Sequence, residues 1–173
     1  MAAIFTAIPR NEDALAGGNK ILLIGRFSVL NPSCLTPDAS GYFTFIDGAE
    51  DEFVKVIPRN QTLKTDDNAI LSNEFGTVAW EPMVSFTLAH RSLVKRNELV
   101  LMAKNEVIIV VVDTEGTGRA FGATNGLKLS TQTTSSGAAW SGELNGYTLE
   151  FKGVSKEPAP YVDADHLATL YTC

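Results

Sequence analysis

The feature that most constrains the fold is an unbroken run of six β-branched residues, Val107 to Val112, in the segment VIIVVVDTEGTGRAFG (107–122). Residues of this shape favour extended strands. Side chains alternate between the two faces of a strand, so a run without a polar position must be covered on both faces. We expect the protein core on one face. The other face meets either the preceding helix or a neighbouring subunit, and we favour the helix.

The glycines after this run raise the question of a phosphate-binding loop. Such a loop needs closely spaced glycines followed by a helix whose N-terminal N–H groups hold the anion. A G-x-G-x-x-G motif that began at Gly116 and Gly118 would need its third glycine at position 121, but the glycine is at 122. No Gly-Lys-Ser/Thr follows either. The next residues alternate apolar and polar side chains, as strands do. The pattern therefore predicts a β-hairpin with its turn at Thr114 to Gly118.

Short segments with strand-like composition recur along the chain, separated by Gly, Pro and Asp. The clearest are 20–30, 42–47, 53–58, 84–88, 127–129 and 147–152. Strands that are not separated by helices favour an antiparallel sheet over a parallel one. The predicted fold class is mainly β: an antiparallel β-sandwich or barrel of about seven or eight strands with one flanking α-helix.

The flanking helix is predicted from Ser92 to about Lys104, in SLVKRNELVLMAK. Ser92 suits the N-cap position, and Asn105 suits a left-handed residue at the C-terminal end. We expect the helix to pack on a sheet through an apolar stripe made of Leu93, Val94, Val100 and Leu101. The charged residues expected in solvent are Lys95, Arg96 and Glu98.

Composition indicates one self-sufficient domain spanning residues 1–173, because 173 residues with 45% hydrophobic content can build a core without disulfides or structural metals. Cys34 and Cys173 are far apart and indicate neither a disulfide framework nor a cysteine-based zinc site. The net charge of −6 argues against a basic surface that grips nucleic acid. No secretion signal or long apolar stretch is evident, so we expect synthesis in the cytoplasm and no membrane partner.

No catalytic motif stands out. The chain has no H-E-x-x-H and no G-x-S-x-G pattern. Asp163 and Asp165, which flank His166, would form a metal site only with ligands from elsewhere in the chain, and acidic residues near a chain end usually face water. We therefore expect no metal, no cofactor and no enzymatic activity.

Several segments are candidates for contacts with other molecules. Residues 60–77 are expected to form a long loop, too long for an ordinary connection. Residues 130–146 are rich in Ser, Thr and Gly and contain Trp140, which either folds back on the core or anchors a partner. Interaction arms are expected at 1–18 and 158–173. The candidate subunit contacts are Ile70, Leu71, Phe75, Trp140, Pro158, Pro160 and Tyr161.

The C-terminal third resembles a known family. Roughly residues 105–162 resemble the closing section of phage and prophage virion proteins of the tail-tube and tail-ring kind. This part of the chain consists of NEVIIVVVDTEGTGRAFGATNGLKL, the Ser/Thr/Gly-rich segment and ELNGYTLEFKGVSKEPAPYV. The matching elements are Phe121-Gly122, the strand from Leu144 to Gly153, and the exit from Glu157 to Tyr161. The resemblance implies a β-sandwich or barrel with one flanking helix.

For function, the resemblance implies a non-enzymatic structural subunit of a virion, made in the cytoplasm of a host bacterium. Its partners would be copies of itself in a ring, commonly of six, other virion proteins, and DNA that passes through the channel without specific binding. An acidic chain suits such a channel because negative charge repels phosphates. Two alternatives stay open: a capsid decoration or auxiliary protein, and a ligand-binding or hydrolytic β-barrel with Asp113, Glu115 and Arg119 at its mouth.

Overall fold

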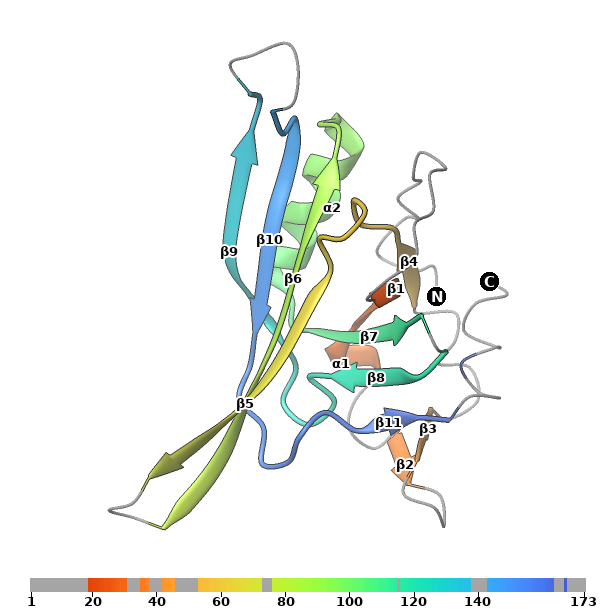
Figure 1. Cartoon of the computed structure of the whole chain (residues 1–173), viewed down its shortest axis with the longest axis vertical. Coiled ribbons are helices and arrows are strands. Elements are labelled where there is room, and N and C mark those ends of the chain that lie inside the picture. Colours follow the sequence, from red (N-terminus) through yellow and green to blue (C-terminus); the bar gives the residue numbers. More distant parts are fainter. Residues whose placement is uncertain are drawn as a thin grey trace.

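Two packed β-sheets and a flanking helix form the protein, which confirms the expected fold class (Figure 1). The computed structural model describes residues 19–30, 35–37, 42–45, 53–72, 76–114, 116–137, 143–163 and 167. Within these ranges, no helix has the length and apolar character needed to span a membrane.

The larger sheet contains seven strands among the described residues, in the spatial order β2-β3-β11-β8-β7-β1-β4. Their bounds are β1 (Asn19–Arg26), β2 (Leu35–Pro37), β3 (Phe43–Phe45), β4 (Val54–Val56), β7 (Val107–Asp113), β8 (Gly118–Phe121) and β11 (Tyr161–Val162). Neighbouring strands are antiparallel, except that β11 runs parallel to β3. A short helix, α1 (Phe27–Leu30), follows β1.

The predicted hairpin at 114–118 is confirmed by the antiparallel pairing of β7 with β8. The backbone N–H of Asp113 donates to the carbonyl of Thr117 at 3.0 Å. The Asp113 carboxylate in turn accepts from the Thr117 N–H at 2.9 Å. Gly116 has a φ of +90°, a conformation that favours glycine over residues with a side chain. The glycines therefore serve the turn.

The smaller sheet contains four strands among the described residues, in the order β5-β6-β10-β9. Their bounds are β5 (Lys64–Ser72), β6 (Thr77–Ala89), β9 (Lys128–Ser135) and β10 (Gly146–Lys152). Alternating residues of β6 and β10 form its buried face, namely Val84, Phe86, Leu88, Tyr147, Leu149 and Phe151. In Figure 1 the long strands of this sheet run across β7 and β8 of the larger sheet, so the two sheets pack at a steep crossing.

The run Val107 to Val112 is buried on both faces, as its composition predicts. Val107, Ile109 and Val111 join the main core between the sheets, together with Leu99 and Met102 of the helix α2 (Leu93–Lys104). The opposite face packs in a second cluster, whose members include Leu30, Phe53 and Leu167. The expectation that the preceding helix covers this second face is therefore wrong. The cover comes from α1, from Phe53 just before β4 and from Leu167 in the C-terminal region.

Helix α2 begins where the sequence predicts but buries a different face. Ser92 is its N-cap, and the Ser92 side chain accepts from the Lys95 N–H at 3.2 Å. The buried residues are Glu98, Leu99 and Met102, so the prediction of a solvated Glu98 is wrong. Three members of the expected stripe, Leu93, Val94 and Val100, are exposed, and Leu101 is partly buried. Asn105 is extended, with a φ of −119°, and not left-handed.

Ser92→Ala is expected to lower the free energy of unfolding by about 1 kcal/mol, because the Lys95 N–H loses its side-chain acceptor at the helix start. Chemical denaturation followed by circular dichroism measures this change. Ser92→Asp provides the matched control, since aspartate also caps helices and should retain nearly all of the stability. Equal loss in both variants would contradict the capping role.

Two segments expected to be irregular are largely strands. Residues 64–72 form strand β5, which pairs with β6 through nine residue pairs. The prediction of a long loop at 60–77 is therefore wrong. Residues 130–135 belong to β9, where threonines, which are β-branched, supply strand propensity without apolar alternation. Both strands escaped prediction because their cross-strand partners, and not their own apolar pattern, hold them in the sheet.

Of the two expected arms, the structure describes part of the C-terminal one. Residues 1–18 lie outside the described residues. In the expected arm at 158–173, Tyr161 and Val162 form β11 between β8 and β3, and Leu167 is buried in the second cluster. This part of the segment therefore belongs to the folded body and is not a free arm. Residues 164–166 and 168–173 lie outside the described residues.

Candidate interaction surfaces

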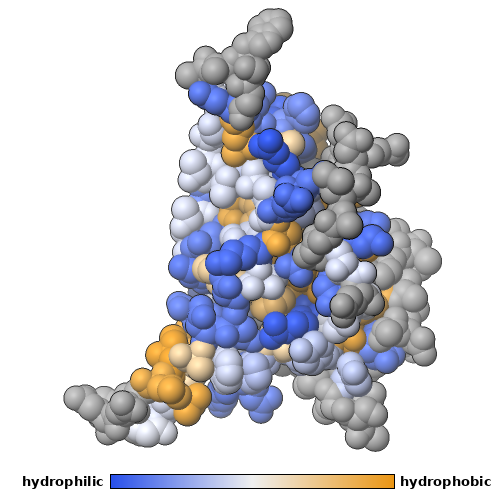
Figure 2. Space-filling model, in the orientation of Figure 1, coloured by the Kyte–Doolittle hydropathy of each residue, from blue (hydrophilic) through white to orange (hydrophobic). Residues whose placement is uncertain are grey.

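The far end of the β5–β6 hairpin projects from the body of the protein (Figure 1). Trp80 of β6 is tied to the body of the protein through reciprocal backbone hydrogen bonds of 2.8 Å with Ser155. Beyond it, Leu71 lies opposite Val78 and Ile70 lies opposite Ala79. Leu71 and Val78 are 67% and 55% exposed, and Ile70 is also exposed. Figure 2 shows this hydrophobic patch on the projecting hairpin. We call Ile70, Leu71 and Val78 the hairpin tip.

Leu71 and Val78 of the hairpin tip continue the apolar face of the smaller sheet beyond the core, whereas Ile70 lies on the other face. Side chains two positions apart in a strand lie on the same face. Val78 is an even number of positions from Val84, Phe86 and Leu88 in β6, which line the core, so its side chain lies on their face. Leu71, directly opposite Val78, shares that face. The larger sheet covers the middle of this face but not the hairpin tip. The strand pattern therefore extends an apolar surface into solvent.

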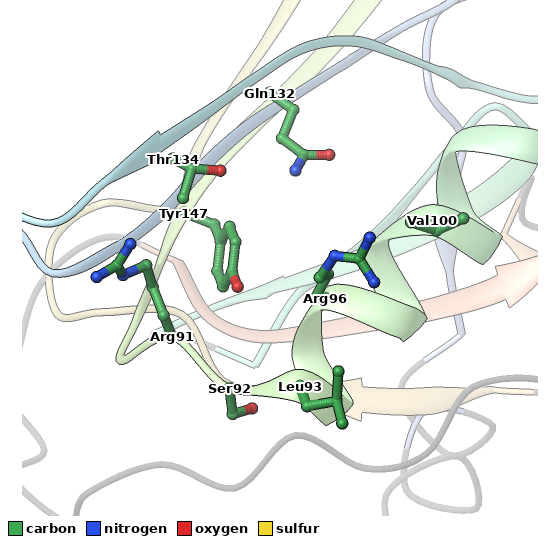
Figure 3. A pocket seen from close by; sticks show the side chains of 8 residues that line it. All are labelled: Arg91, Ser92, Leu93, Arg96, Val100, Gln132, Thr134 and Tyr147. Carbon is green, nitrogen blue, oxygen red and sulfur yellow. The ribbon is translucent and has the colours of Figure 1, made fainter.

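A groove of about 580 Å³ lies at the other end of the smaller sheet, between α2 and β9 (Figure 3). Tyr147 of β10 projects between the helix and the strand and forms the floor. On the strand side, Gln132 and Thr134 lie opposite Leu149 and Tyr147 in the register, so they share the inner face of the sheet. The remaining lining residues, Arg91, Ser92, Leu93, Arg96 and Val100, come from the start and one side of α2.

The turn between β6 and α2 fixes the shape of this groove. The backbone N–H of His90, a residue with a φ of +60°, donates to the carbonyl of Asn145 at 2.7 Å. Arg91 Nε donates to Asn145 Oδ1 at 2.9 Å. The Lys95 ammonium donates to the carbonyls of Ala89 and His90, and partial burial lowers its pKa below the usual value. These bonds tie the turn to Asn145, just before β10, and the first turn of α2 to the end of β6.

Gly146 is required at this junction. A Cβ atom there would overlap the carbonyl oxygen of Leu88, the residue next to its cross-strand partner Ala89. Because that obstacle is backbone, the sheet would have to shift to accept a side chain. Gly146 thus allows the close approach of β10 to β6 beside the groove.

The two surfaces carry opposite charge. Between residues 64 and 82, the hairpin has one lysine and four acidic residues, a net charge of −3. Between residues 91 and 104, the helix segment has four basic residues and one glutamate, a net charge of +3. Arg91 and Arg96 line the groove itself. An acidic apolar hairpin and a basic apolar groove therefore occur on one chain.

A buried ion pair anchors the base of the hairpin. Asp67 Oδ2 accepts from Arg119 Nη2 at 3.0 Å and from the Ala159 N–H at 2.7 Å. The Asp67 side chain is 8% exposed, whereas that of Arg119 is 33% exposed. The Arg119 guanidinium also lies 5.2 Å and 5.5 Å from the ring centres of Phe121 and Tyr161. This cluster joins β5, β8 and the segment that leads into β11.

Two of the three residues proposed for a ligand-binding mouth have other described partners. Arg119 is bound to Asp67, and Asp113 closes the β7–β8 turn. Glu115, Asp165 and His166 lie outside the described residues. Within the part of the chain that the structure describes, no three or more metal-ligating side chains form a group.

The candidate contacts from sequence fall in different places. Ile70 and Leu71 lie on the hairpin tip, while Pro158, Pro160 and Tyr161 lie along the segment that enters β11. Tyr161 is half exposed and packs edge to face on Tyr42, with ring centres 6.5 Å apart. Phe75 and Trp140 lie outside the described residues.

Sequence reasoning missed Val78 and the exposed side of α2, formed by Leu93, Val94 and Val100. A signal was available: apolar residues occur on more than one side of this helix, which is more than packing on a single sheet needs.

The chain matches no protein-family model, no curated protein and no solved structure significantly. Its class is therefore defined by its own fold and surfaces: a two-sheet β protein with a flanking helix, a projecting apolar hairpin and a separate apolar groove.

Proposed function

We propose that the protein is a non-enzymatic structural subunit of a phage virion that assembles with its own copies into a ring, in the tail tube or in the ring that joins head and tail. The observation that carries the proposal is the presence of two different exposed apolar surfaces on one subunit, the hairpin tip and the α2 side of the groove. Contiguous exposed apolar patches mark sites of association. A ring closed by rotation requires two unlike, complementary surfaces on every subunit.

The charge of the chain supports a channel for DNA. A net charge of −6 gives each ring a strong excess of negative charge. A wall of that sign repels phosphates, so a duplex slides through the channel without sticking to it. Partners in this role are further copies of the chain, neighbouring virion proteins and DNA that is not specifically bound.

Electron microscopy of the purified protein across a concentration series, paired with light scattering for mass, tests the proposal. We expect rings or short tubes with a central hole, growing in number with concentration. Trimers without a central channel would favour the capsid decoration protein instead. A monomer at every concentration would contradict self-assembly.

One observation favours a second candidate, a small-molecule binding protein. The groove volume of about 580 Å³ falls in the usual range for ligand sites, and two arginines line it. Calorimetry with nucleotides and common sugars tests this candidate. A saturable heat at one ligand per chain that disappears in Arg96→Ala would support it over assembly at this groove.

A further inference from the structure

We infer that the hairpin tip of one copy inserts into the groove between α2 and β9 of the next copy. The inference rests on the proposed self-assembly and names the two surfaces that would carry it. Each copy would offer its hairpin to one neighbour and its groove to the other.

The contact has to form between copies because the two surfaces lie apart on one subunit. In Figure 1 the hairpin tip extends away from the body at the end opposite the start of α2, with the length of the smaller sheet between them. A subunit therefore cannot fill its own groove with its own hairpin. An interface between unlike surfaces repeats from copy to copy and closes into a ring when the rotation allows it.

Apolar complementarity favours the hairpin as the occupant. Leu93, which is 70% exposed, and Val100 lie one above the other on the groove side of α2, seven residues apart. The hairpin tip presents Leu71 and Val78 from one face of a narrow two-stranded ribbon. A second copy removes both sets of side chains from water in one contact, and burial of apolar surface is the main favourable term in association.

Charge sets the orientation. The groove is lined by Arg91 and Arg96, and the hairpin carries Glu81 behind its tip. Opposite potentials on two docking surfaces steer encounter and oppose like-with-like pairing. Two hairpins, each with more acidic than basic residues, would repel one another, as would two grooves. Hairpin-to-groove contact is the combination that the charges favour.

The edge strand β9 gives the groove an open side. Among the described strands, β9 is hydrogen bonded to β10 alone. An edge strand offers backbone groups to an incoming strand of another chain. The strands of the hairpin suit this arrangement because their backbone is already extended.

Two variants that disable opposite surfaces test the inference. Leu71→Asp places a charge on the hairpin tip and leaves the groove intact. Leu93→Asp places a charge in the groove and leaves the hairpin intact. Position 93 lies in the first turn of α2, where an acidic residue stabilises the helix. Both positions are exposed, so the monomer should fold, which circular dichroism checks. Val154→Asp, at an exposed position outside both surfaces, is the matched control.

We expect each single variant to weaken self-association by about 30-fold or more, as loss of a central interface residue does. Light scattering should then show monomers for either variant alone and normal assemblies for the control. An equimolar mixture should give dimers and nothing larger, because the intact hairpin of one variant fits the intact groove of the other. No other pair of surfaces predicts this combination of results.

Other outcomes separate this inference from the proposed function. If the wild type assembles and either variant assembles equally well, or if the mixture forms no dimer, the hairpin-to-groove contact is overturned while self-assembly stands. If the wild type stays monomeric at every concentration, both are contradicted.

A cross-link provides a second measurement that does not depend on those variants. In a chain carrying Cys34→Ser and Cys173→Ser, Leu71→Cys in one copy and Leu93→Cys in another should form a mixed disulfide when oxidised glutathione is added. Leu71→Cys paired with Val154→Cys is the control. Equal yields for the two pairs would overturn the inference.

Discussion

Phe86→Ala is expected to lower the free energy of unfolding by about 4 kcal/mol. Phe86 and Phe151 are both fully buried between the sheets, and their rings are stacked, with centres 6.0 Å apart and planes inclined by 8°. Removing one ring loses its transfer free energy and leaves a cavity against the other. Equilibrium unfolding in guanidinium chloride measures the loss.

Phe86→Leu and Val154→Ala are the controls for this experiment. Leucine retains most of the apolar volume and should cost less than half as much as alanine. Val154 is exposed, so its truncation should change stability by less than about 0.5 kcal/mol. A loss below about 1 kcal/mol in Phe86→Ala would show that this pair is not at the centre of the packing.

Asp67→Ala is expected to lower the free energy of unfolding by about 2–3 kcal/mol. The substitution leaves the Ala159 N–H without its side-chain acceptor and Arg119 without its counter-charge. Breaking a buried ion pair usually costs more, but the Arg119 side chain is one third exposed and water can solvate it. Chemical denaturation at neutral pH measures the effect.

The neighbouring residue supplies the control for Asp67. Asp66 forms a 2.7 Å ion pair with Lys64, whose side chain is 67% exposed. Asp66→Ala should therefore cost less than about 1 kcal/mol, as exposed ion pairs do. Equal losses at the two positions would contradict the anchoring role of Asp67. A loss confined to Asp67 would show that the base of the hairpin is held by its bond to β8 and to Ala159.

Strands and turns with strong local signals were predictable. Val107 to Val112 favours an extended strand whatever surrounds it, and Gly116 allows the positive φ of the turn that follows. Ser92 caps α2 because its side chain reaches an N–H three residues away. Each of these features depends on residues close together in the chain, so the sequence around it carries the information.

The candidate surfaces were only partly predictable. Ile70 and Leu71 stood out as apolar residues in a polar segment, but the segment is a paired strand and not a loop. Leu93, Val94 and Val100 were expected to pack on a sheet, yet α2 packs through Leu99 and Met102 and leaves all three exposed. A helix with apolar residues on more than one side has no local signal that selects the buried one.

The sequence alone determined the mainly β class, the strand that is buried on both faces, the β7–β8 turn and the start of α2, because propensity, periodicity and capping act within a few residues. Only the tertiary structure decided what covers each face. Asp67 meets Arg119 across 52 positions, and Leu30 and Leu167 cover the outer face of β7 from distant parts of the chain. Such contacts depend on how the sheets cross, which also leaves the hairpin tip and the groove open at opposite ends.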